Sequence, residues 1–159
     1  MNFEQLIEDL KKGTGMKRAE AAKHLGKIND MRAVKPLVEA LQDTNMGVRN
    51  NVAFALGELG AREAIPHLIK VLLGDPEEWV RKSAAKALGM LGSREAVSHL
   101  AKALKDQSQM VRKSAARSLG QIGGIQAVQA LRTVSSLDSL VFRMAKEALE
   151  KLKTDTFKE

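Results

Sequence analysis

The segment from Asp75 to Lys105, DPEEWVRKSAAKALGMLGSREAVSHLAKALK, decides the fold of this 159-residue chain. In its first half Val80, Ala84 and Leu88 recur at helical spacing and give one apolar face. Gly92 follows, and a glycine at this place is typical of a helix end because it adopts a left-handed conformation without strain. A second apolar set comes after that glycine: Ala96, Val97, Leu100, Ala103 and Leu104. The segment therefore predicts two helices joined by a short turn.

The start of the first helix is predicted at Asp75-Pro76. Aspartate is a good N-cap and proline suits the first helical position, while Glu77 and Glu78 suit the first turn. Gly89, in the last turn, has another predicted purpose. Without a side chain it lets a neighbouring helix approach closely, at a cost of about 1 kcal/mol in helix propensity.

The same pattern recurs on both sides of this segment, in the stretches that begin at Asp43 and at Asp106. Two unrelated positions keep one irregular rhythm: Gly26, Gly57, Gly89 and Gly120, and Leu37, Leu68, Leu100 and Leu131. In both series the middle interval is longer than the two outer ones by a single position. Chance similarity would not reproduce that irregularity twice. The chain is therefore predicted to be an array of structural repeats.

The repeats predict a single domain that spans residues 1–159. A cap helix is predicted at residues 1–14. Four two-helix repeats follow it, at residues 15–42, 43–74, 75–105 and 106–135. A second cap helix is predicted at residues 136–153, and a frayed tail at residues 154–159. Both end helices carry extra charged residues, which suits the solvated outer face that repeat arrays require at their ends.

Three sequence elements carry a family resemblance: D-x-x-x-x-V-R, then A-x-x-A-L-G-x-[LI]-G, then an A-[VI]-x-x-L helix. Together they resemble the HEAT repeat and, more narrowly, the HEAT-like repeat of the phycobilisome lyase group, over residues 3–152. The resemblance implies an all-α fold, a right-handed α-α superhelix (a HEAT-like solenoid) of about ten helices. It is specific to a fold rather than to a function, because the family includes scaffolds, lyases and other enzymes.

Composition narrows the class of protein. Aromatic residues make up only 3% of the chain and cysteine is absent, so thiolate chemistry and cysteine-ligated metals are excluded. No apolar run is long enough for a membrane span, and no signal peptide is evident. We therefore expect a soluble cytoplasmic protein. The net charge of +7 favours acidic partners.

Aspartate and arginine recur with a six-residue separation in three repeats: Asp43 and Arg49, Asp75 and Arg81, Asp106 and Arg112. We interpret them as a structural ladder of charge-assisted hydrogen bonds that ties the turns of successive repeats together. Arg18 has no matching aspartate in its repeat, and Phe142 replaces arginine in the last helix. The ladder is therefore expected to fail at both ends.

The sequence lacks the residues that two kinds of HEAT-repeat enzyme need, a di-iron hydroxylase and a DNA glycosylase. A HEAT-repeat hydroxylase that binds two irons has His-Glu pairs just after the repeat arginine, whereas this chain has Asn50-Asn51, Lys82-Ser83 and Lys113-Ser114. A DNA glycosylase needs an aromatic cleft for a damaged base, and this chain has one tryptophan and no tyrosine.

The remaining candidate side chains favour structural roles. His67 and His99 share a repeat position but lack a third ligand, so we expect polar surface residues and no metal or other cofactor. Trp79 is interpreted as core or inter-repeat packing, with an anchor for a partner as the alternative.

The predicted function is a non-enzymatic scaffold that binds a protein partner. Its predicted binding surface is a concave face formed by the second helix of each repeat, with these residues: Lys35, Glu39, His67, Lys70, His99, Lys102, Gln129 and Arg132. This set is net basic and suits an acidic protein segment.

Two alternatives stay open. One is nucleic-acid binding through a convex basic strip of Lys82, Lys86, Lys113 and Arg117. The other is a tetrapyrrole lyase-like or accessory subunit, which the family resemblance alone implies. The sequence leaves the oligomeric state open.

Overall fold

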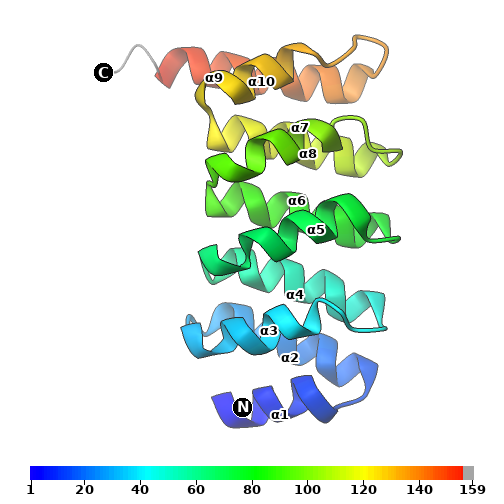
Figure 1. Cartoon of the computed structure of the whole chain (residues 1–159), viewed down its shortest axis with the longest axis vertical. Coiled ribbons are helices and arrows are strands. Elements are labelled where there is room, and N and C mark those ends of the chain that lie inside the picture. Colours follow the sequence, from blue (N-terminus) through cyan, green and yellow to red (C-terminus); the bar gives the residue numbers. More distant parts are fainter. Residues whose placement is uncertain (156–159) are drawn as a thin grey trace.

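The computed structural model describes residues 1–155, and these form ten α-helices and no β-strand (Figure 1). The helices are α1 (Phe3–Lys12), α2 (Gly15–Lys27), α3 (Val34–Ala40), α4 (Met46–Glu58), α5 (Ile65–Gly74), α6 (Glu78–Leu91), α7 (Val97–Ala103), α8 (Gln109–Ile122), α9 (Gly124–Arg132) and α10 (Ser139–Asp155). Short 3₁₀ turns precede three of them: η1 (Met31–Ala33), η2 (Arg62–Ala64) and η3 (Arg94–Ala96). The predicted all-α solenoid is confirmed.

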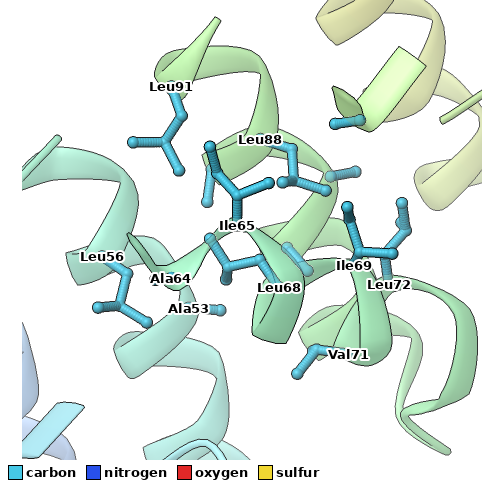
Figure 2. Packing of buried hydrophobic residues seen from close by; sticks show 14 of the residues in the cluster. Ala53, Leu56, Ala64, Ile65, Leu68, Ile69, Val71, Leu72, Leu88 and Leu91 are labelled. Atoms are coloured by element: carbon cyan, nitrogen blue, oxygen red, sulfur yellow. The ribbon is translucent and has the colours of Figure 1, made fainter. Parts of the chain in front are cut away.

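The helices form two layers along the stack (Figure 1). In one layer the even-numbered helices α2, α4, α6, α8 and α10 lie side by side in succession, and in the other lie the shorter odd-numbered helices. The core lies between the layers. In Figure 2, Ile65 and Leu68 of α5 occupy the space between Leu56 of α4 and Leu88 of α6, and all four are buried. The sequence needs this stacking because one helix pair cannot bury its own apolar face.

Glycine sets the close approach within the even-numbered layer. A Cβ atom added at Gly57 would lie 2.8 Å from the Cα of Ala87 in the next even-numbered helix, and one added at Gly26 would lie 2.8 Å from the Cα of Ala55. At Gly120 the Cβ of Ala148 would be only 2.6 Å away. The predicted purpose of the recurrent glycine is confirmed.

The helix ends agree with the sequence more closely than the starts do. Gly60 and Gly92 have φ angles of 67° and 61°, the left-handed conformation expected after a helix. The predicted start at Asp75-Pro76 is wrong, because α6 begins at Glu78. Asp75 instead accepts hydrogen bonds from the Glu77 backbone N–H and from Arg49 of the preceding repeat, so it organises the turn before the helix.

Each predicted repeat range contains one even-numbered helix and the odd-numbered helix that follows it. At the C-terminal end the prediction is too short, since α10 includes residues 154 and 155, which were expected to be frayed. The remainder of the expected tail, residues 156–159, lies outside the described residues. Within residues 1–155 no helix is long and apolar enough to cross a bilayer. A cytoplasmic location stays a prediction.

Candidate functional site

The recurrent arginines bridge one repeat to the next. Arg49 donates through Nε and Nη2 to the two carboxylate oxygens of Asp75, at 2.7 and 3.1 Å. Its Nη1 atom donates to the backbone oxygen of Asp43, at 2.9 Å. The guanidinium therefore holds the backbone of its own turn and the carboxylate of the following turn at once. Such a two-pronged contact has both the strength and the directionality of a charge-assisted pair.

The ladder has four rungs among the described residues, and it includes both ends. Arg81 donates to Asp106 at 2.9 Å with both nitrogens, Arg18 to Asp43 at 2.7 and 2.9 Å, and Arg112 to Asp138 at 2.7 Å. The interpretation that the ladder joins successive turns agrees with these contacts. The expectation that it fails at the ends is wrong, because Arg18 pairs with Asp43 and Arg112 with Asp138. Arg18 also donates to the backbone oxygen of Gly13, at the place where Arg49 uses that of Asp43.

Three aspartates of the ladder, Asp43, Asp106 and Asp138, have a pKa below the ordinary value, and hydrogen bonds from their arginine partners contribute to it. The Arg18 guanidinium holds the pKa of Asp43 below its ordinary value, and the backbone N–H of Asn45 adds to the effect. Burial of Asp106 raises its pKa, but hydrogen bonds from Arg81 and from the Ser108 N–H outweigh that effect, and the pKa lies below its ordinary value. The carboxylates of Asp43 and Asp106 are therefore stabilised in their charged form in the folded chain.

These pKa shifts predict a loss of stability in acid. An aspartate whose pKa is lower in the folded chain contributes stability above its unfolded pKa of about 4, and that contribution is lost as the pH falls through the folded pKa. We expect the free energy of unfolding, measured by urea titration, to be level between about pH 7 and pH 5 and to fall below about pH 4. The Asp106→Asn variant should lose less stability over the same acid range, and an equal loss in both proteins would contradict the ladder as the cause.

The eight residues predicted to bind a partner lie on the odd-numbered helices, and we call them the odd-helix surface. Seven are exposed and His99 is half-buried. Among residues 1–155 no group of three or more histidine, aspartate or glutamate side chains is placed to hold a metal ion. That the odd-helix surface binds a partner stays a prediction.

A second surface lies on the even-numbered helices. Lys82 and Lys86 of α6 and Lys113 and Arg117 of α8 form what we call the basic face. Two of these cations lie over aromatic rings. The Lys82 ammonium is 4.9 Å from the centroid of Trp79, and the Lys86 ammonium is 4.6 Å from the centroid of Phe54, which belongs to α4. The basic face therefore combines positive charge with aromatic rings, through cation–π contacts.

Trp79 does not have the packing role that was expected. Its side chain is 48% exposed, while its neighbour Val80 is fully buried. The two residues follow one another at the first turn of α6, so they point to different sides of the helix, and only Val80 faces the core. The alternative interpretation of Trp79, as an anchor for a partner, is consistent with this exposure.

At the basic face, the surface over α6, α8 and α10 has two hollows. One hollow of about 280 Å³ is lined by Lys82, Met110, Lys113, Ser114, Arg117 and Met144. An adjoining hollow of about 520 Å³ shares Arg117 and Met144 with it and extends to Glu147 and Lys151. Cations around methionine side chains suit a ligand that carries both carboxylates and apolar groups.

The family is established by the match of the HEAT repeats model to residues 3–76 and 65–150. The chain belongs to the HEAT repeat family. Within it, the chain is 46% identical over 57 residues to a phycocyanobilin lyase subunit alpha of Picosynechococcus sp., and 43% identical over 60 residues to the subunit of that name in Synechococcus elongatus. These segments are 36% and 38% of this chain and 21% and 22% of the two relatives, so the match spans about a fifth of each relative.

A solved structure extends the similarity to nearly the whole chain. The complex of CpcE and CpcF of the phycocyanin lyase from Nostoc sp. superposes with a TM-score of 0.80 at 29% sequence identity, over 97% of this chain and 66% of that one. The predicted resemblance to the lyase group is confirmed. The expectation of a non-enzymatic protein is wrong, because these relatives are named as lyase subunits or belong to a lyase complex. The expectation failed because it was based on the lack of a recognisable catalytic motif in the sequence. A repeat protein can take part in an enzyme without such a motif.

Proposed function

We propose that the chain is a subunit of a bilin-lyase-type assembly and that it works while bound to a second protein chain. The superposition on the CpcE–CpcF complex over 97% of the chain is the observation that carries the proposal. The identities of 46% over 57 residues and 43% over 60 residues to phycocyanobilin lyase subunits alpha also support it. The sequence predicts that the chain binds a protein partner. In this proposal the partner is the other chain of the lyase-type assembly.

The chemistry of this chain's own surface is compatible with such a task. A bilin is a linear tetrapyrrole that carries propionate carboxylates on an apolar, conjugated body. Lysine and arginine side chains bind carboxylates, and methionine and aromatic side chains cover apolar rings. The larger of the two hollows offers both kinds of group, with Lys151 and Met144 in its lining.

An affinity pull-down tests this proposal. The tagged full chain is captured from lysate of its source organism at low and at high salt, and bound proteins are identified by mass spectrometry. We expect a lyase subunit or a phycobiliprotein at stoichiometric level, retained at high salt. Recovery of nucleic acid alone, lost as the salt concentration rises, would contradict the proposal and favour the nucleic-acid alternative, because phosphate contacts are strongly salt-dependent.

A further inference from the structure

Positive charge is concentrated at one part of the even-numbered layer. The repeats place the two basic-face positions at equivalent points of successive helices, so their side chains can be compared directly. In α2 and α4 the equivalents are Ala19, Lys23, Asn50 and Phe54, whereas in α6 and α8 they are Lys82, Lys86, Lys113 and Arg117. Two rows of cations therefore cross from α6 to α8, and nothing similar precedes them.

These four cations differ from the ladder arginines in lacking carboxylate partners. No carboxylate within the described part of the chain forms an ion pair with any of them, while every ladder arginine is paired. Like charges on adjacent helices repel one another, and an occupant that brings carboxylates would remove that repulsion. The contacts with Trp79 and Phe54 place apolar rings beside the charges. The occupant should therefore be acidic and amphipathic.

The spacing of the rows favours a helix as the occupant. Packed helices lie about 8–10 Å apart, so equivalent cations on α6 and α8 are about one such step apart. Seven residues of an α-helix span about 10.5 Å and return to nearly the same side, so carboxylates at i and i+7 can face both cations. An extended strand covers that distance in about three residues, whose side chains alternate and point to opposite sides.

The hollow beside α8 extends this match. Lys82 of α6 lines one side of the hollow, and its apolar lining consists of Met110 of α8 and Met144 of α10, one and two helix steps from α6. Position i+11 of a helix lies about 16 Å from position i and on nearly the same side. An apolar residue there would reach the hollow when the residue at position i faces α6.

We propose that the basic face binds an acidic amphipathic helix of the partner protein, laid across α6 and α8, with carboxylates at i and i+7 and an apolar residue at i+11. The inference rests on the proposed function in one respect, since the partner is the second chain of the lyase-type assembly. The charges, the ring contacts and the hollow support it without that assumption.

A synthetic peptide tests the surface directly. The probe is an alanine-rich helical peptide with glutamate at i and i+7 and leucine at i+11. Trp79 is the only tryptophan of the chain and is exposed on this side, so its fluorescence reports binding to the purified full chain. A control peptide of the same composition has the second glutamate at i+5, which lies on the other side of the helix. We expect the control to bind at least about tenfold more weakly, because its second carboxylate cannot reach α8.

Matched variants locate the site. Lys86→Glu with Arg117→Glu reverses one charge on each of α6 and α8. Lys70→Glu with Lys102→Glu reverses two exposed lysines on α5 and α7, in the odd-helix surface. We expect the first pair to weaken peptide binding by at least about tenfold and the second pair to leave it within about twofold. If circular dichroism shows that the first pair misfolds, Lys86→Gln with Arg117→Gln replaces it.

Three results would overturn the inference: equal binding of the two peptides, equal effects of the two variant pairs, or displacement of the peptide by a single-stranded oligonucleotide with a steep salt dependence. The proposed function can fail separately. If the lyase-type partner co-purifies equally with wild type and with the basic-face variant, this surface is wrong and the function stands. If the peptide binds in register but the captured proteins include no lyase subunit or phycobiliprotein, the function is wrong and the surface stands.

Discussion

Replacing Arg81 by alanine is expected to lower the free energy of unfolding by roughly 2–3 kcal/mol, the range for hydrogen bonds that involve charged groups and leave a partner unsatisfied. Arg81 donates two hydrogen bonds to Asp106 and one to the backbone oxygen of Asp75, and its side chain is only 15% exposed. Its loss would leave the half-buried Asp106 carboxylate without its ion-pair partner. Urea unfolding followed by circular dichroism measures the change.

Two further variants make the Arg81 result specific. Arg94→Ala removes an exposed arginine in η3, and we expect a change within about 0.5 kcal/mol, as is usual for surface positions. Arg81→Lys should recover only part of the loss, since an ammonium cannot make the two-pronged contact. Similar stability of the Arg81→Ala and Arg94→Ala proteins would contradict a structural ladder.

The Gly57→Ala variant is expected to be less stable by about 2 kcal/mol, which is within the range for overpacked sites. In an isolated helix the same change would be stabilising by about 1 kcal/mol, because alanine is the better helix former. In this chain the added Cβ would lie 2.8 Å from the Cα of Ala87, so the backbone of α6 must move away from α4. Thermal unfolding followed by circular dichroism measures the sign directly.

Gly74 provides the matched control for Gly57. It ends α5, has no positive φ angle, and a Cβ added there would meet no atom within 4 Å. Gly74→Ala should therefore be neutral or slightly stabilising. A Gly57→Ala protein at least as stable as wild type would show that the even-numbered helices have room to spare, contrary to the packing described above.

Repetition explains how much of the fold the sequence discloses. The irregular rhythm that the glycines and leucines share predicts the two-helix unit and the close contact at Gly57. It does not disclose which repeat an arginine reaches, because a six-residue separation within one turn and a contact with the next turn fit the same pattern. The periodicity does indicate the C-terminal rung of the ladder, which the sequence analysis did not predict. Asp138 continues the series of Asp43, Asp75 and Asp106 at nearly the same interval.

The candidate binding surfaces were harder to predict, for a physical reason. Core positions are constrained by packing, so their residues repeat, whereas a surface position carries no such constraint and its role depends on neighbours from other repeats. Lys86 contacts Phe54 of the preceding even-numbered helix, a pair separated by a full repeat that no local pattern indicates. Trp79 directly precedes Val80 and Arg81 at the start of a helix, and only its place on α6 shows that it is exposed while Val80 is buried.

The central claim is that this chain is a working subunit of a bilin-lyase-type assembly, and reconstitution tests it most directly. The full chain, the protein that co-purifies with it, phycocyanobilin and bilin-free phycocyanin are mixed, and the colour that stays on the phycocyanin polypeptide after denaturation is measured. We expect bound bilin only when the chain and its partner are both present. Equal amounts of bound bilin with and without the chain, or none with both subunits present, would contradict it.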